Sequence, residues 1–147
     1  MPCPSGPEKG IKQIIMKISI NLRVYGLLMR ERRVLVAEEK VGHQEILKFP
    51  GGGVEVDETP EQALIREFRE ECQINITPIG LVHVPGTLFS PWIHRLYTPL
   101  FYEIKSLGKP TAHPSEKINL RFLNPSDLLN NDRVALPERE ALKKILD

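Results

Sequence analysis

Residues 51–74 read GGGVEVDETPEQALIREFREECQI, in which three glycines precede a helix-forming segment. Thr59 is a preferred N-cap residue, Pro60 suits the first helical position, and Gln62 completes a capping box with Thr59. These signals predict a helix from about Pro60 to Cys72. The glycines, which directly follow a proline, predict an irregular turn rather than a helix or a strand.

The predicted helix carries an apolar face and a separate acidic face. The apolar side chains are expected to pack on a sheet; they are Leu64, Ile65, Phe68 and Cys72. Glu67, Glu70 and Glu71 form the acidic face at positions i, i+3 and i+4, where like charges cost roughly a few tenths of a kcal/mol per pair. One interpretation is a solvated face that Arg66 and Arg69 partly neutralise. The other is that the three carboxylates share a ligand.

A divalent cation would account for the acidic face and for the glycines before it. Carboxylate and carbonyl oxygens are the ligands that Mg²⁺ and Mn²⁺ prefer. Mg²⁺ that is held by few carboxylates usually completes its coordination with water and substrate phosphates. The cation also offsets the carboxylates and lets a polyanionic substrate approach. The pattern therefore indicates metal-dependent phosphate chemistry.

The same segment resembles the Nudix box, G-x5-E-x7-R-E-U-x-E-E-x-G-U, where U is an aliphatic residue. Ile74 fills the last apolar position, and the six residues in register with the fixed positions are Gly52, Glu58, Arg66, Glu67, Glu70 and Glu71. Two residues depart from the pattern. Phe68 replaces an aliphatic residue, and Gln73 stands where the family has glycine. A left-handed backbone at Gln73 would cost about 1 kcal/mol.

The resemblance implies an α/β fold, namely a Nudix-like α/β/α sandwich with helices packed on a mixed sheet. It implies hydrolysis of a diphosphate linkage in a nucleoside triphosphate or nucleotide conjugate, with Mg²⁺ as cofactor and Mn²⁺ as a substitute. Arg66 and Glu58 are implied to pair and to hold the loop against the helix; the alternative is an exposed ion pair of little energetic worth. The implied metal ligands are Glu67, Glu70, Glu71 and the Gly51 carbonyl.

Several carboxylates are candidates for the general base. Glu67 and Glu70 lie within the motif itself. Glu116 ends the loop over 107–115, and Glu55 lies in the turn before the helix. For Glu116 and Glu55, an ordinary exposed surface glutamate is the alternative interpretation.

Substrate contacts outside the motif are predicted at Arg23, Trp92 and Glu116. Arg23 lies on the polar side of the first predicted strand. It is interpreted either as a residue that binds a phosphate group or as a solvated arginine. Trp92 belongs to a group of aromatic residues that offers a stacking surface for a base or, alternatively, fills the core. The members of that group are Phe89, Trp92, Tyr97, Phe101 and Tyr102.

The first part of the chain predicts a flexible leader and two strands. Residues 1–10 form the leader, and 11–147 form a single catalytic domain. Strict alternation predicts a half-buried strand over 17–24. After a charged turn, a second strand is predicted over 34–37 and a loop over 38–45.

The last part of the chain predicts strands and two short helices. Strands are expected near 80–84, 93–104 and 117–123, with a bulge or an edge position at Pro99. Asn124 is expected to cap a short helix that ends at Leu129. A final helix begins at Pro137, with a buried stripe formed by Ala141, Leu142, Ile145 and Leu146. Strands thus outnumber helices, which favours a mixed sheet with helices packed on it.

Composition excludes several classes of protein. Twenty Lys and Arg residues against nineteen Asp and Glu give a net charge of +1, which argues against a nucleic-acid partner. No apolar run is long enough to predict a membrane span. The two cysteines, Cys3 and Cys72, make a poor disulfide framework, which favours a location in the reducing cytoplasm. A small nucleotide is the expected partner, and the resemblance allows a homodimer. The alternative functions are a catalytically silent nucleotide-sensing Nudix module and an RNA-end pyrophosphohydrolase.

Overall fold

The computed structural model describes residues 21–91 and 94–147. The predicted leader, the start of the predicted strand over 17–24, and Trp92 lie outside the described residues. In chain order the elements are β1 (Leu22–Arg30), β2 (Arg33–Val41), β3 (Gln44–Lys48), β4 (Gly51–Gly53), α2 (Pro60–Cys72), β5 (Thr77–His83), β6 (Leu88–Ser90), β7 (Arg95–Lys105), β8 (Ile118–Leu123), α3 (Pro125–Leu129) and α4 (Leu136–Leu146).

β1 lies at the centre of the sheet, whose strand order is β3-β2-β1-β7-β5. One edge of β1 runs parallel to β7 from Leu22 to Leu28. The other edge pairs antiparallel with β4 near Val24 and with β2 near Arg30. β8 pairs with β2, and β6 pairs with the start of β7. The sheet is therefore mixed, as the sequence predicts.

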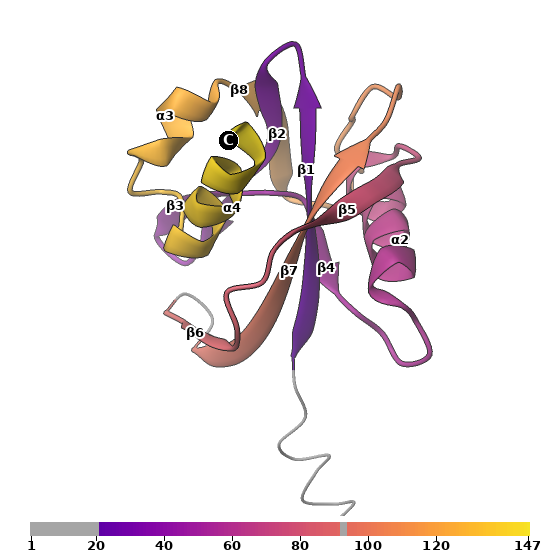
Figure 1. Cartoon of the computed structure of the whole chain (residues 1–147), viewed down its shortest axis with the longest axis horizontal. Helices are drawn as coiled ribbons and strands as arrows, with labels where there is room; N and C mark the ends of the chain where they lie inside the picture. The colour runs from indigo at the N-terminus through magenta and orange to yellow at the C-terminus, as the bar shows by residue number, and fades with distance from the viewer. Residues whose placement is uncertain (1–20, 92–93) are drawn as a thin grey trace, which may run out of the picture.

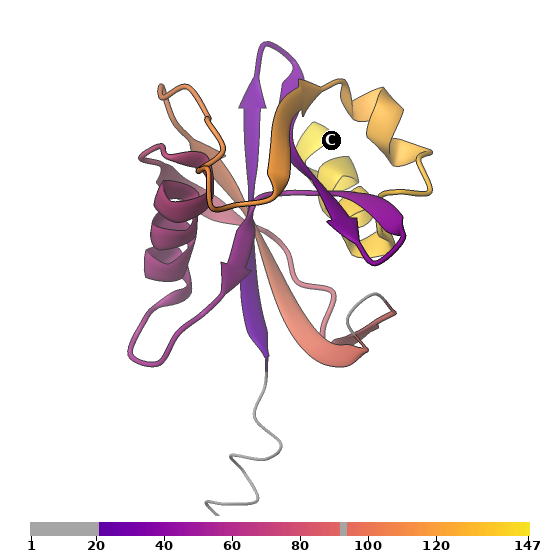
Figure 2. The ribbon, with the colours of Figure 1, turned by 180° about the vertical axis from the view of Figure 1, so that it is seen from behind.

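Helices cover both sides of this sheet. α2 packs against β1, β4 and β5 on one side, while α3 and α4 lie on the opposite side (Figure 1). The view from behind shows the same separation, with the strands crossing between the two helical layers (Figure 2). This arrangement confirms the predicted α/β/α sandwich.

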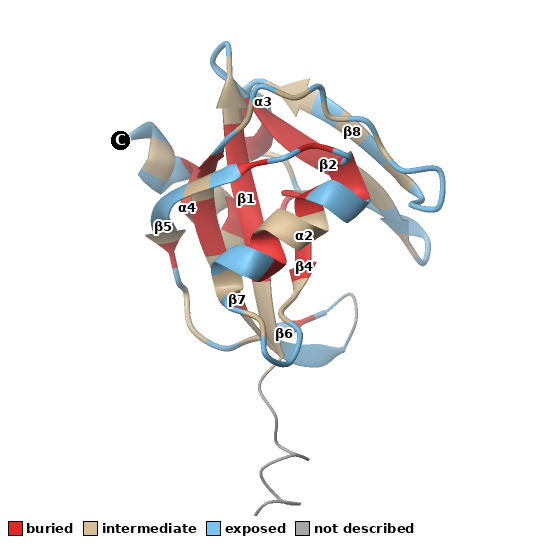
Figure 3. Cartoon of the chain, turned by 90° about the vertical axis from the view of Figure 1, so that its right-hand side faces the viewer, coloured by how far each residue is buried: buried red, intermediate tan, exposed pale blue. Residues whose placement is uncertain are grey.

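Both faces of β1 are buried. Val24 and Leu28 pack in the core cluster under α2 together with Phe68, and Figure 3 shows this buried strand behind the helix. Tyr25 and Leu27 pack in the second cluster, which includes residues of α4. The prediction of a strand that ends at 24 with one solvated face was wrong, because helices on both sides remove β1 from water and the strand continues to Arg30.

The segment 38–45, predicted as a loop, forms a hairpin. β2 extends to Val41 and pairs antiparallel with β3 across a turn at Gly42, whose φ is 63°. The predicted strand over 34–37 is the buried part of β2, and the remainder is exposed or half-buried. Backbone pairing rather than side-chain burial holds the outer part, so hydrophobicity did not reveal it.

The helix predictions are largely confirmed. α2 has the predicted bounds, and Thr59 and Gln62 form the predicted capping box. Gln73 ends α2 in the left-handed conformation (φ 55°), which glycine adopts at lower cost. Asn124 caps α3. The predicted stripe of α4 is buried or half-buried except at Leu146, which is exposed in the last turn. No helix within 21–91 and 94–147 is long and apolar enough to cross a membrane.

Replacement of Gly26 by Ala tests the packing of α2 on β1. A Cβ at Gly26 would lie 2.7 Å from the ring of Phe68 and 2.9 Å from Ile104, both of which are buried. We expect Gly26→Ala to lower the free energy of unfolding by about 1–3 kcal/mol, measured by urea denaturation. Gly80→Ala is the matched control, because a Cβ there meets nothing within 4 Å. Equal stabilities of the two variants would contradict this packing.

Candidate active site

β4 brings a glycine backbone directly against the acidic face of α2. A Cβ at Gly52 would lie within 2.6 Å of the Glu67 carboxyl group, so this close approach requires glycine. The segment is a strand, and not the predicted irregular turn, because it pairs with β1 from Arg23 to Tyr25. The Gly51 backbone N–H donates to Glu71 Oε2 at 3.2 Å. The strand thus holds two carboxylates of the helix through close contacts with its backbone.

Arg66 ties the loop before α2 to the helix and to β4. Its Nε and Nη2 donate to the two carboxylate oxygens of Glu58 at 2.7 and 2.8 Å, and Nη2 also donates to the Gly53 carbonyl at 2.9 Å. The Glu55 backbone N–H donates to Glu58 as well. These hydrogen bonds lower the pKa of Glu58 to about 2 and raise the pKa of Arg66. The predicted pair of Arg66 and Glu58 is therefore present as a bidentate salt bridge.

The remaining arm of Arg66 lies between two carboxylates of the acidic face. Nη1 contacts Glu67 Oε1 at 3.1 Å and Glu70 Oε2 at 3.2 Å. Glu55 is more distant, 3.7 Å from the same nitrogen, and is largely exposed. In the described part of the chain, no three acidic, histidine or cysteine side chains converge as metal ligands. The guanidinium is the positive charge that Glu67 and Glu70 share here.

Glu71 is a buried carboxyl group with few partners. Its side chain packs at the base of α2 with 6% relative exposure. Burial raises the pKa of Glu71 to about 7, against the attraction of Lys48 and the Gly51 N–H. Burial also raises the pKa of Glu67. Two desolvated carboxyl groups beside an exposed one are a hard-oxygen donor set, so these residues fit a divalent cation.

A cleft of about 320 Å³ lies next to the acidic face on the α4 side of the sheet. Its charged walls include Arg23, whose Nε donates to the Tyr25 hydroxyl at 2.8 Å, and Lys48, which pairs with Glu39 at 2.5 Å. The charges of Glu67 and Glu71 help to raise the pKa of Arg23, and the charge of Glu71 helps to raise the pKa of Lys48. The two cations therefore line the cleft within electrostatic range of the acidic face. The lining residues are Arg23, Tyr25, Glu39, Val41, Ile46, Lys48, Ser90, Arg95, Tyr97 and Glu138.

The structure brings some of the predicted substrate residues to this region. Arg23 lines the cleft. Glu116 follows a loop that is tied to the end of α2, because the His113 N–H donates to the Glu71 carbonyl. The negative charge of Glu116 helps to raise the pKa of Glu71. Of the aromatic group, Tyr97 lines the cleft, whereas Phe101 and Tyr102 are buried in the core.

Sequence reasoning missed most of the cleft's lining, including the charged residues Lys48 and Glu138. Lys48 lies at the end of β3, three residues beyond the predicted loop over 38–45. Glu138 lies in the first turn of α4, where a glutamate is commonly explained by the helix dipole. The alternation along β1 was the signal that could have located the cleft, because it places two of the lining residues, Arg23 and Tyr25, on one face of the strand.

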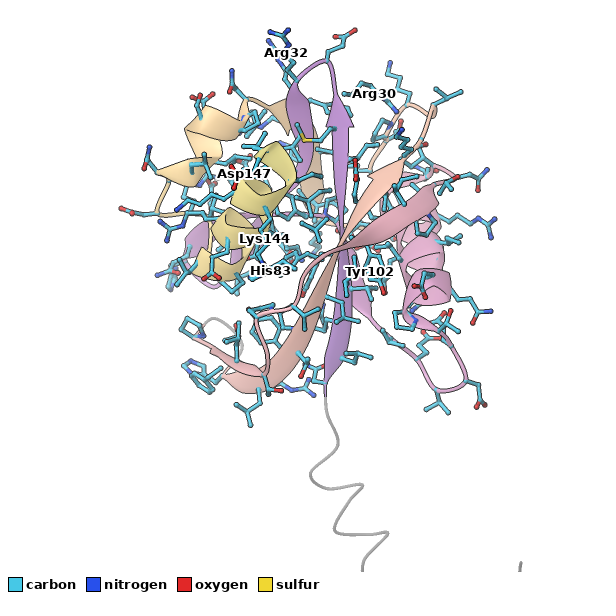
Figure 4. The ribbon with its side chains drawn as sticks, viewed as in Figure 1. Arg30, Arg32, His83, Tyr102, Lys144 and Asp147 are labelled. Carbon is cyan, nitrogen blue, oxygen red and sulfur yellow. The ribbon has the colours of Figure 1, made fainter. Side chains whose placement is uncertain are left out.

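A larger hollow of about 830 Å³ lies elsewhere, at the other end of β1. Arg30 points toward the loop after β7 (Figure 4) and donates to the carbonyls of Ser106 and Gly108. The lining of this hollow includes residues 73–75, which directly follow α2, but none of the three carboxylates of the acidic face. We therefore assign the chemistry to the acidic face and the adjoining cleft.

The sandwich, the glycine strand and the carboxylate-bearing helix define a class of phosphate-handling α/β/α proteins. A family model described as NUDIX domain matches residues 20–145, which is most of the chain. The chain therefore belongs to the Nudix family. Nudix hydrolases generally use divalent metal ions.

Solved structures share the fold. The chain is similar to the ORF135 protein of E. coli, with 24% identity, 87% of this chain and 89% of that chain covered, and a TM-score of 0.73. It is also similar to a MutT Nudix hydrolase from Burkholderia pseudomallei, with 21% identity, 86% and 98% coverage, and a TM-score of 0.73.

Curated relatives match over shorter stretches. An RNA pyrophosphohydrolase of Marinomonas sp. (strain MWYL1) is 51% identical over 56 residues, which are 38% of this chain and 34% of that protein. An 8-oxo-dGTP diphosphatase of Proteus vulgaris is 54% identical over 35 residues, 24% of this chain and 31% of that protein. The match thus spans about a third of the length of these relatives.

Replacement of Gly52 by Ala tests the contact between β4 and the acidic face. The added Cβ displaces the Glu67 carboxyl group, so we expect at least a tenfold rise in the Mg²⁺ concentration that gives half-maximal activity. Gly53→Ala is the matched control, because the nearest atom to its Cβ is Arg23 Nη1 at 3.9 Å. If both variants require the same Mg²⁺ concentration as the wild type, Glu67 does not depend on this contact.

The raised pKa of Glu71 predicts a pH-dependent stability. The folded protein keeps the proton of Glu71 up to about pH 7, whereas the unfolded chain loses it near pH 4.5. The free energy of unfolding without metal should therefore fall as pH rises from 4.5 to 7, by on the order of 3 kcal/mol from this group. Glu71→Gln should remove that share in urea denaturation at pH 5 and pH 8. An unchanged pH dependence in the variant would contradict the assignment.

Proposed function

We propose that this chain hydrolyses a diphosphate linkage in a small nucleotide, either a nucleoside triphosphate or a nucleotide conjugate, with Mg²⁺ as cofactor and Mn²⁺ as a substitute. The observation that carries the proposal is the set of Glu67, Glu70 and Glu71, held against a glycine strand within electrostatic range of two cations, Arg23 and Lys48, that line a cleft. The family, and relatives named as diphosphatase and pyrophosphohydrolase, support it. The buried free thiol of Cys72 supports a cytoplasmic location.

The carboxylates would hold the metal, together with the Gly51 carbonyl. A divalent cation at this place supplies charge neutralisation and polarisation of the phosphoryl oxygens. Glu71 and Glu67 lose solvation in the fold, which favours a cation as their common partner over two separate charges. Glu70 is exposed at 55% and remains open to substrate.

Other residues would bind and orient the substrate. Arg23 and Lys48 line the cleft within electrostatic range of the acidic face, where they would neutralise phosphate oxygens and set the direction of the polyphosphate. Arg66 and Glu58 position the helix relative to β4 without contacting the substrate, which makes them positioning residues. Glu67, Glu70 and Glu116 are the candidates for the general base. Glu55 has less support, because its contact with Arg66 is long and exposed.

A panel assay tests the proposed reaction. Purified protein is incubated with Mg²⁺ or Mn²⁺ and a set of nucleoside triphosphates and nucleotide conjugates, and the products are separated to locate the broken bond. We expect release of a mononucleotide or of pyrophosphate from at least one member. No product from any member with either metal would overturn the proposal and would favour a nucleotide-sensing module.

Glu70→Gln separates an enzyme from a sensing module. The side chain is exposed and its only described contact is Arg66, so the fold should be retained. We expect a fall of at least 100-fold in kcat, because the variant loses a charged oxygen ligand of the metal. Glu61→Gln, on the first turn of the same helix, is the control and should keep its activity. A fully active Glu70→Gln variant would contradict the assigned role.

RNA ends are a second candidate substrate, favoured by the 51% identity to an RNA pyrophosphohydrolase over 56 residues. The net charge of +1 favours a small nucleotide instead. Activity that increases with RNA length and falls steeply with salt would support the RNA substrate.

A further inference from the structure

Arg30, the last residue of β1, contacts both ends of the loop over 106–117, which joins β7 to β8. Its Nη1 donates to the Gly108 carbonyl at 2.8 Å, and its Nη2 donates to the Ser106 carbonyl. The guanidinium also lies over the ring of Phe122 in β8, 5.3 Å from the ring centroid. β1 and β7 pair in parallel, so Arg30 lies level with the first residues after β7. One side chain thus joins the start of the loop to the strand that follows it.

The middle of this loop lies on the C-terminal end of α2. The last carbonyl groups of an α-helix have no partner within the helix. The Thr111 N–H donates to the Cys72 carbonyl at 2.9 Å, and the His113 N–H donates to the Glu71 carbonyl at 3.4 Å. Gln73 Nε2 in turn donates to the Thr111 carbonyl at 3.1 Å. The loop backbone therefore completes the hydrogen bonding of the helix that carries the acidic face.

Gly108 adds a packing contact to the part of the loop that Arg30 holds. A Cβ at Gly108 would lie 2.8 Å from Cγ2 of Ile74, a buried residue just after α2. The Ser106 hydroxyl accepts from the Gly108 N–H and donates to the Asn75 carbonyl at 2.6 Å. Arg30, Ser106 and Gly108 thus fix the first part of the loop relative to the end of α2.

Glu116 lies near the far end of the loop, and its backbone N–H donates to the His113 carbonyl at 2.9 Å. Its place therefore depends on the residue that contacts the end of α2. Resting on the proposed function, in which Glu116 is a candidate for the general base, we infer that Arg30 is a positioning residue that anchors the loop and so presents Glu116 to the acidic face. Arg30 is not among the residues that line the cleft, so it acts through the loop and not on the substrate.

Replacement of Arg30 by Met removes both hydrogen bonds to the loop and keeps an unbranched side chain against Phe122. With the substrate that the panel assay identifies, we expect kcat to fall at least tenfold, because a loosened loop presents Glu116 less often. KM and the Mg²⁺ concentration for half-maximal activity should change less than threefold. Arg30→Lys keeps the charge but lacks a planar group that spans two carbonyls, so it should recover part of the loss.

Arg32→Met is the matched control and should keep the kcat of the wild type. Arg32 is exposed in the turn after β1, and Figure 4 shows its side chain pointing away from the loop.

A double-mutant cycle separates an effect through Glu116 from a general one. Glu116→Gln should itself lower kcat at least tenfold, and Arg30→Met added to it should lower kcat less than twofold further. A tenfold loss from Arg30→Met in both backgrounds would overturn the inference. Wild-type kcat in either single variant would overturn it as well.

Amide hydrogen exchange tests the anchor without turnover. In Arg30→Met, the Thr111 and His113 amides should exchange at least fivefold faster than in the wild type, while amides in the middle of β1 keep their rates. Gly108→Ala disturbs the same loop through Ile74 and should give the same changes in exchange and kcat, so the test does not depend on one variant. Unchanged exchange in both variants would overturn the inference. Faster exchange at these amides, without hydrolysis of any substrate by the wild type, would overturn the proposed function alone.

Discussion

The carboxyl group of Glu67 occupies the space that a side chain at Gly52 would fill, and this close approach fixes how α2 lies on the sheet. Once the helix is at that distance, Arg66 reaches the Gly53 carbonyl and Glu71 reaches the Gly51 N–H. Phe68, on the adjacent face of the helix, then enters the core over Gly26. The packing of the helix and the arrangement of the acidic face therefore have a common origin in the glycines of two neighbouring strands.

A net charge of +1 conceals a steep local separation of charge. The acidic face gathers three carboxylates beside β4, while Arg23 and Lys48 line the cleft within electrostatic range of them. Buried charges are costly unless they are paired, so each group lies within range of an opposite one. A metal ion and a polyphosphate are opposite in charge to the two halves of this site. The same separation that costs stability in the free protein thus favours both ligands together.

The sequence predicted the helix, its capping box and its acidic face because each depends on neighbouring residues at fixed spacing. It did not predict the hairpin of β2 and β3 or the strand at Gly51–Gly53, because backbone pairing holds them while residues 38–40, 44 and 45 are polar and the three glycines carry no side chain. For the same reason Lys48 was missed. Glu138 was missed because its burial depends on β1 and β7, which are distant in sequence.

Arg66 shows how the site can exist both with and without a cation. Its contacts with Glu58 and Gly53 involve Nε and Nη2, while Nη1 alone faces Glu67 and Glu70. A cation that took over the two carboxylates would displace only Nη1 and would leave three hydrogen bonds of the guanidinium in place. The low pKa of Glu58 keeps that pair ionised throughout the physiological pH range. The geometry of the helix is therefore set independently of the ion, so binding does not have to assemble the site.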